Sequence, residues 1–184
     1  MVRRAGTVEK ARAMVGVALS ALGAEPDRAA FGPDTWLVSK GSAAVVIRVV
    51  GHGTDPDASD VHVQVTSPVM RVPPDPGFSA HLLKLNHEMG GLACFAVTPQ
   101  GEVHLVAART YRDVGAPEIA RLIAQVAHFS DAYDDPLLER YGAQYALRPG
   151  AVPPRAKPPA PPPALRDPGS RAAPPGRPPG KGPA

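Results

Sequence analysis

Proline divides this chain into two parts of different kinds. Residues 148–184 hold 14 of the 24 prolines, with Val152 and Leu165 as their only larger apolar side chains. Proline fixes its own φ and lacks an amide donor, and a segment with so little apolar surface cannot build a core. We therefore expect a folded domain over residues 1–147 and a disordered basic proline-rich tail over residues 148–184.

Charge follows the same division. The tail has seven basic side chains and one acidic one, a net charge of +6, whereas the whole chain carries +3, so residues 1–147 carry −3. Basic side chains spaced by proline can contact nucleic acid or another anionic surface through non-specific electrostatics. The candidate contact residues are Arg155, Lys157, Arg166, Arg171, Arg177 and Lys181.

Helical hydrophobic spacing occurs in three segments of the first 147 residues. It predicts helices over about residues 8–22, 78–89 and 116–133, and the sequence Asp135-Pro136 predicts the start of a separate short helix. Residues 24–34, between the first helix and the first strand, are rich in turn formers and are expected to be a connector.

Strand patterns fill the space between these helices. TWLVSK and AAVVIRVV flank Gly41-Ser42, and LACFAVTP and VHLVAARTY flank Gln100-Gly101-Glu102, so each pair predicts a hairpin. VHVQVTSPVM alternates as a strand with one buried face, and its Pro68 indicates either a weakened ladder at that point or an edge strand. The expected fold class is α+β, a mainly antiparallel five-stranded sheet with helices packed on it, in the order α-β-β-β-α-β-β-α.

The segment KLNHEMGGLACF, residues 84–95, contains residue types that enzymes use for acid–base and nucleophilic chemistry. Successive helical residues turn by about 100°, so Asn86, His87 and Glu88 cannot converge on one substrate. We expect a helix end running into a strand, with Cys94 as a small buried hydrophobe. The expected buried residues are Leu82, Leu85, Met89 and Phe95, and the expected exposed ones are His87 and Glu88.

No pattern in the sequence indicates a metal, cofactor or catalytic site. No two of the six histidines stand at the i, i+4 or i, i+2 spacing of paired ligands. The acidic loop 51–60 has no glutamate at its end and is interrupted by Pro56, so it is not an EF-hand. His62 and His104 lie on the polar sides of two strands and could meet only if those strands were neighbours.

Two further function classes are disfavoured. Aromatic residues make up 5% of the chain, which is little material for stacking the bases of single-stranded nucleic acid. Residues 1–23 begin basic and turn apolar, but Glu9, Lys10 and Arg12 interrupt the run, which favours a structural helix over an export signal. No apolar run approaches the ~18 residues of a membrane span, so we expect a cytoplasmic protein without membrane contact.

Two stretches, LLKLNHEMGGLACFAVTPQGEVHLVAART and EIARLIAQVAHFSDAYDDPLLERYG, carry a family resemblance. Their Leu-Leu-x-Leu-Asn helix, Phe-containing strand and Gly-centred turn, with an aromatic at Phe129 or Tyr133 near the end of the last helix, resemble a YbjN-type domain. That family shares its fold with the type III secretion chaperones. The resemblance covers about residues 8–142.

The resemblance implies a function without catalysis, because the YbjN-type family has no established catalytic residues. It favours a non-enzymatic bacterial protein-binding module, chaperone-like or regulatory, that forms a homodimer and uses no cofactor. The long basic proline-rich tail departs from the family pattern. It leaves open a second hypothesis, a nucleic-acid-associated accessory protein that uses the tail.

Overall fold

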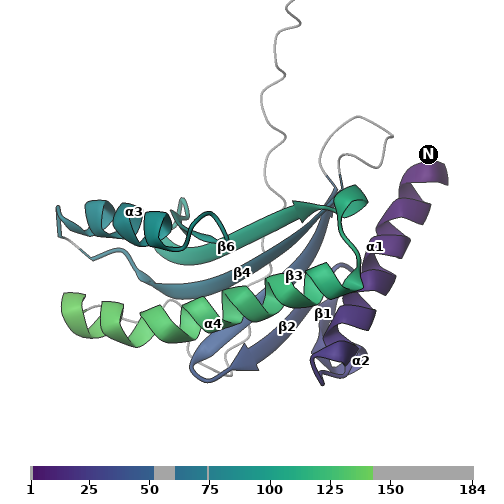
Figure 1. Cartoon of the computed structure of the whole chain (residues 1–184), viewed down its shortest axis with the longest axis horizontal. Helices are drawn as coiled ribbons and strands as arrows, with labels where there is room; N and C mark the ends of the chain where they lie inside the picture. Colours follow the sequence, from purple (N-terminus) through teal and green to yellow (C-terminus); the bar gives the residue numbers. More distant parts are fainter. Residues whose placement is uncertain (1, 52–60, 74, 143–184) are drawn as a thin grey trace, which may run out of the picture.

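The computed structural model describes residues 2–51, 61–73 and 75–142 (Figure 1). The helices are α1 (Val2–Ala21), α2 (Pro26–Ala29), α3 (Phe78–Glu88), α4 (Ala116–Tyr141) and the 3-10 helix η2 (Tyr111–Asp113). The strands are β1 (Ala30–Gly32), β2 (Thr35–Lys40), β3 (Ala43–Gly51), β4 (Val61–Arg71), β5 (Cys94–Val97) and β6 (Glu102–Thr110). The α+β class and both predicted hairpins are confirmed.

The sheet has six antiparallel strands in the order β1-β2-β3-β4-β6-β5, one more than the five expected. The additional strand is β1, which lies with α2 in the segment predicted to be a plain connector. Its pairing consists of Ala30 opposite Trp36 and Gly32 opposite Thr35. A strand of three residues is too short to produce a readable alternation of polar and apolar residues, so its sequence carries only the turn signal.

Pro68 lies inside the sheet, so the edge-strand alternative is wrong. Strand β4 pairs with β3 on one side and with β6 on the other. The alternative of a weakened ladder is confirmed, because the register between β4 and β6 shifts between Pro68 and Met70. Proline has no amide hydrogen to donate to the ladder, and a bulge at this point lets the two strands pair without that hydrogen bond.

The core lies between one face of the sheet and the helices α1 and α4. Figure 1 shows α4 lying across that face, with α1 beside its N-terminal end. Alternate residues of β4 and β6 point to these helices, as the alternation of their sequences predicts, whereas residues 43–47 of β3 are all buried. The fully buried side chains include Leu19, Val45, Ile47, Val63, Val65, Leu105, Ile119 and Ile123.

Helix α4 continues through Pro136, so the predicted separate helix after Asp135 is wrong. Tertiary packing keeps the last turns helical despite the proline. Leu137 is buried, and the ring of Tyr141 packs edge-on against Phe78 with 4.8 Å between the ring centroids. Gly142, with a φ of 59°, ends the helix in the left-handed conformation that glycine adopts readily.

None of the helices in the described ranges is long and apolar enough to cross a membrane.

Candidate functional site

The segment 84–95 is the junction of α3 and β5 and contains no converging catalytic set. The predicted burial of Leu82, Leu85, Met89 and Phe95 is confirmed, as is the exposure of His87 and Glu88. The expectation that Cys94 is buried is wrong, because its thiol is exposed. Phe95 points to the helices, with 5.9 Å between the centroids of its ring and that of Tyr133. Because successive strand residues point to opposite faces, the neighbouring Cys94 faces the other side of β5.

The polar-face histidines of the sheet do not meet, although β4 and β6 are neighbours. His62 pairs with Thr110, whereas His104 pairs with Pro68. The two histidines are therefore six residues apart along the ladder, about 20 Å at the usual rise per residue. Within the described ranges, no group of three or more His, Cys, Asp or Glu side chains could hold a metal ion.

The remaining candidates of the sequence lie outside the described residues. They are the acidic loop at residues 52–60 and the tail contacts Arg155, Lys157, Arg166, Arg171, Arg177 and Lys181.

A buried polar cluster joins the β2–β3 hairpin to α4. The Ser42 hydroxyl donates to Asp134 Oδ2 at 2.6 Å, and the Ser42 amide donates to Asp131 Oδ1 at 3.1 Å. Beside them, the hydroxyls of Ser67 and Ser130 lie 2.7 Å apart. Asp134 is only 2% exposed, and none of the histidines in the described part of the chain is bonded to Ser42, Ser67 or Ser130. The cluster therefore stabilises the fold and contains no activated nucleophile.

Burial raises the pKa of the Asp134 carboxyl above its ordinary value, and the hydrogen bonds from Ser42 and Asp135 partly offset that rise. A raised folded-state pKa means that the native state binds the proton more tightly than the unfolded chain does. The ordinary pKa of an aspartate carboxyl is 3.8, and that of Asp134 in the folded protein lies above it. The contribution of Asp134 to the free energy of unfolding therefore falls as the pH rises from 3.8 through the raised pKa.

We expect Asp134→Asn to lose this part of the pH dependence. Urea unfolding of the wild type and the variant at a series of pH values would measure it. The difference in unfolding free energy, wild type minus variant, should grow as pH is lowered toward 3.8. A difference that stays constant over this range would contradict the assignment.

The other notable surface is the outer side of β2. Pairing with β1 ends at Trp36, and no described strand flanks Leu37–Lys40 on that side. We call this stretch the open edge of β2. The amide of Val49 donates to the carbonyl of Asp34, which fixes the alternation of the β2–β3 ladder. Even-numbered residues of β2 thus direct their main-chain groups to β3, and Leu37 and Ser39 direct theirs outward.

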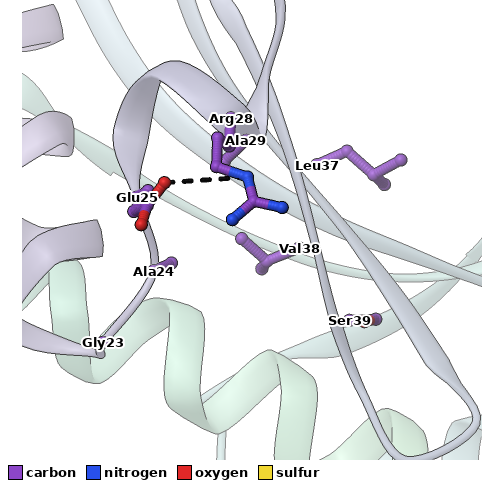
Figure 2. A pocket seen from close by; sticks show the side chains of 8 residues that line it. All are labelled: Gly23, Ala24, Glu25, Arg28, Ala29, Leu37, Val38 and Ser39. Carbon is purple, nitrogen blue, oxygen red and sulfur yellow. Dashed lines mark ion pairs between the residues drawn. The ribbon is translucent and has the colours of Figure 1, made fainter.

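A pocket of about 350 Å³ adjoins the open edge (Figure 2). The turn after α1 and helix α2 form one wall, and β2 forms the other. The side chains of Ala24, Ala29 and Val38 give the pocket apolar surface, while Glu25 and Arg28 form an ion pair at 3.6 Å. Both charged side chains are largely exposed, so the ion pair adds little stability and both charges remain accessible.

A second pocket, of about 600 Å³, lies between α3 and the end of α4. Its lining mixes Asp75 and Glu88 with Lys84 and Arg140, and His81 Nδ1 lies 2.8 Å from the Tyr141 hydroxyl. Charges of both signs line this pocket. They do not converge on one point where a substrate group could react, so we favour the open edge of β2 as the functional site.

Comparison with known proteins identifies the fold but not a family. No protein-family model matches the chain, and no curated protein matches it. Three solved structures match with a TM-score of 0.50 each. A chain of the ExsC–ExsE complex is 10% identical, with coverage of 70% of this chain and 93% of that one.

Two further matches are similar in extent. A chain of the HopA1–SchA chaperone–effector complex is 12% identical, over 67% of this chain and 91% of that one. A chain of the heterodimeric ExoU–SpcU complex, from the type III secretion system of Pseudomonas aeruginosa, is 14% identical, over 68% and 98%. The fold is type III secretion chaperone-like. At these identities the similarity concerns the fold alone.

The open edge was not predicted from the sequence. Which strand lies at the edge of a sheet depends on strand order, and no local pattern in TWLVSK encodes it. The one available signal is the shortness of the AFG segment, which can pair with only part of a six-residue neighbour.

Proposed function

We propose that this chain is a non-enzymatic protein-binding module, chaperone-like or regulatory, of the YbjN type. Its partner binds as an extended segment that adds a strand to the open edge of β2. The observation that carries the proposal is that Ser39 directs its main-chain donor and acceptor away from β3, beyond the end of the pairing with β1 at Trp36. Strand addition to an exposed sheet edge is a common mode of peptide recognition.

The adjoining pocket supports this mode of binding. In strand addition, main-chain hydrogen bonds supply affinity and pockets for alternate side chains supply specificity. The surface formed by Ala24, Ala29 and Val38 suits an apolar side chain of the partner. Arg28 and Glu25 at the rim suit a charged side chain of either sign next to it.

The structural neighbours also support a protein partner. The HopA1–SchA structure is a chaperone–effector complex, and ExoU–SpcU is a heterodimer. We propose by analogy of fold that this chain likewise engages another protein.

The partner can be sought with a phage-displayed library of short random peptides, selected on the wild type. We expect the selected peptides to share alternating apolar positions without proline, because each must form a strand. Peptides that bind without such alternation, or that are rich in proline, would contradict strand addition.

The homodimer implied by the family resemblance stays a prediction. Size-exclusion chromatography with light scattering of the full chain would test it, and a strict monomer at all concentrations would refute it.

Nucleic-acid binding by the tail also stays a prediction. A gel shift of the full chain against a chain ending at residue 147 would test it, and binding unaffected by the truncation would exclude the tail mechanism.

A further inference from the structure

The open edge of β2 is closed at one end. Strand β1 pairs with β2 only as far as Trp36, where Ala30 lies opposite. At the other end β2 finishes at Lys40, before the turn into β3. An added strand can therefore lie beside Leu37–Lys40, and at Trp36 it meets Ala30, which already holds the next place in the ladder. The partner chain must leave the sheet at that point.

Strand direction decides which part of the partner reaches the closed end. Every pair of described strands is antiparallel, and antiparallel pairing is the more stable kind per residue. An antiparallel partner runs from Lys40 toward Trp36, so its C-terminal half arrives at Trp36. Residues directly opposite each other in such a pair direct their side chains to the same face. The partner residue opposite Val38 therefore shares the face of Val38 and enters the pocket that Val38 lines.

Helix α2 flanks the exit of the partner chain, because it runs directly into β1 at Ala30. Its Arg28 lines the pocket, and Figure 2 shows the guanidinium directed from α2 into the space beside Val38. The Nε atom lies 3.6 Å from Glu25 Oε2, which is an ion pair but too long for a hydrogen bond. The two terminal nitrogens lie on the side away from Glu25 (Figure 2), and no acceptor in the described part of the chain is bonded to them.

We propose that Arg28 selects a partner segment with an acidic side chain two residues after the apolar residue that enters the pocket. The partner residue opposite Leu37 is the last that fits in the ladder, and the residue after it passes α2 as the chain leaves the sheet. The free side of the Arg28 guanidinium can bind the carboxylate of that residue through two parallel hydrogen bonds. The proposal rests on the proposed function, since it assumes strand addition at the open edge of β2.

The test uses two peptides of the same composition, Ser-Thr-Thr-Ile-Thr-Glu-Thr-Ser and Ser-Glu-Thr-Ile-Thr-Thr-Thr-Ser, each amidated at the C-terminus and labelled at the N-terminal amine. They differ only in whether Glu follows or precedes Ile by two residues. In fluorescence anisotropy the wild type should bind the first peptide about threefold more tightly, the size of effect that an exposed ion pair gives. Arg28→Ala should bind the two peptides equally. The Arg28 side chain is 83% exposed, so this variant should fold as the wild type does.

The matched control is Lys40→Ala, which removes one exposed positive charge at the other end of the open edge and should keep the preference for the first peptide. Equal affinities of the wild type for the two peptides would overturn the proposal, as would a preference for the second peptide, a preference that persists in Arg28→Ala, or no binding of either peptide.

Ser39→Pro separates a failure of this proposal from a failure of the proposed function. If it weakens both peptides while the wild type shows no preference between them, strand addition stands and the role of Arg28 does not. If Ser39→Pro leaves the binding of both peptides unchanged, strand addition itself fails.

Discussion

Replacing Gly41 with alanine should lower the free energy of unfolding by about 2–4 kcal/mol. Gly41 has a φ of +56°, a left-handed conformation that costs an L-residue about 1–2 kcal/mol. A Cβ at this position would lie 2.0 Å from Asp131 Oδ1, so Asp131 must move and lose the hydrogen bond from the Ser42 amide. A hydrogen bond to a charged group contributes about 1.5–3 kcal/mol, and partial exposure of Asp131 reduces that contribution here.

The matched control is Gly101→Ala in the other hairpin. Gly101 has a φ of +75°, but nothing lies within 4 Å of an added Cβ. It should therefore lose only the conformational part, about 1–2 kcal/mol. Equal losses for the two variants in urea unfolding would show that the hydrogen bond from the Ser42 amide to Asp131 contributes nothing to stability.

Replacing Ser39 with proline should weaken binding of the selected peptides by tenfold or more, about 1.4 kcal/mol, without unfolding the sheet. Ser39 directs its amide away from β3, so the β2–β3 ladder keeps all its donors. Proline is tolerated at the exposed side of an edge strand, but it removes the donor that an added strand requires. Fluorescence anisotropy with labelled peptides would measure the change in affinity.

Two variants separate the loss of the donor from other effects. Ser39→Ala keeps the amide and removes only an exposed hydroxyl, so its affinity should stay within about twofold of the wild type. Val38→Pro should instead destabilise the fold, because Val38 directs its amide to β3, opposite Val45. An unchanged affinity in folded Ser39→Pro would rule out strand addition at this edge.

The sequence predicts those parts of the fold that local chemistry decides. The hairpins at Gly41 and Gly101 follow from glycines that adopt positive φ between β-rich segments. The buried faces of the longer strands follow from alternation over many residues. Prediction failed where tertiary packing outweighed a local preference. Proline disfavours a continuous helix, but the packing of Leu137 and Tyr141 stabilises the helix on both sides of Pro136.

The candidate sites depend on strand order and docking, which no local pattern encodes. Asn86 looks like a helix-end residue in the sequence, and its hydrogen bond from the Phe95 amide arises only because β5 lies against α3. Cys94 was expected inside, but the helices cover the face of β5 that carries Phe95. The edge position of Leu37–Lys40 arises because β1 pairs with only the beginning of β2.

The most direct test of the proposed binding mode is amide exchange at Ser39, measured by NMR with and without a saturating selected peptide. Strand addition at the open edge predicts that the Ser39 amide exchanges at least tenfold more slowly in the complex, because it then donates to the peptide main chain. The amide of Val38, already directed to β3, should change little. Slowed exchange confined to α3 and the end of α4, with Ser39 unchanged, would contradict the account.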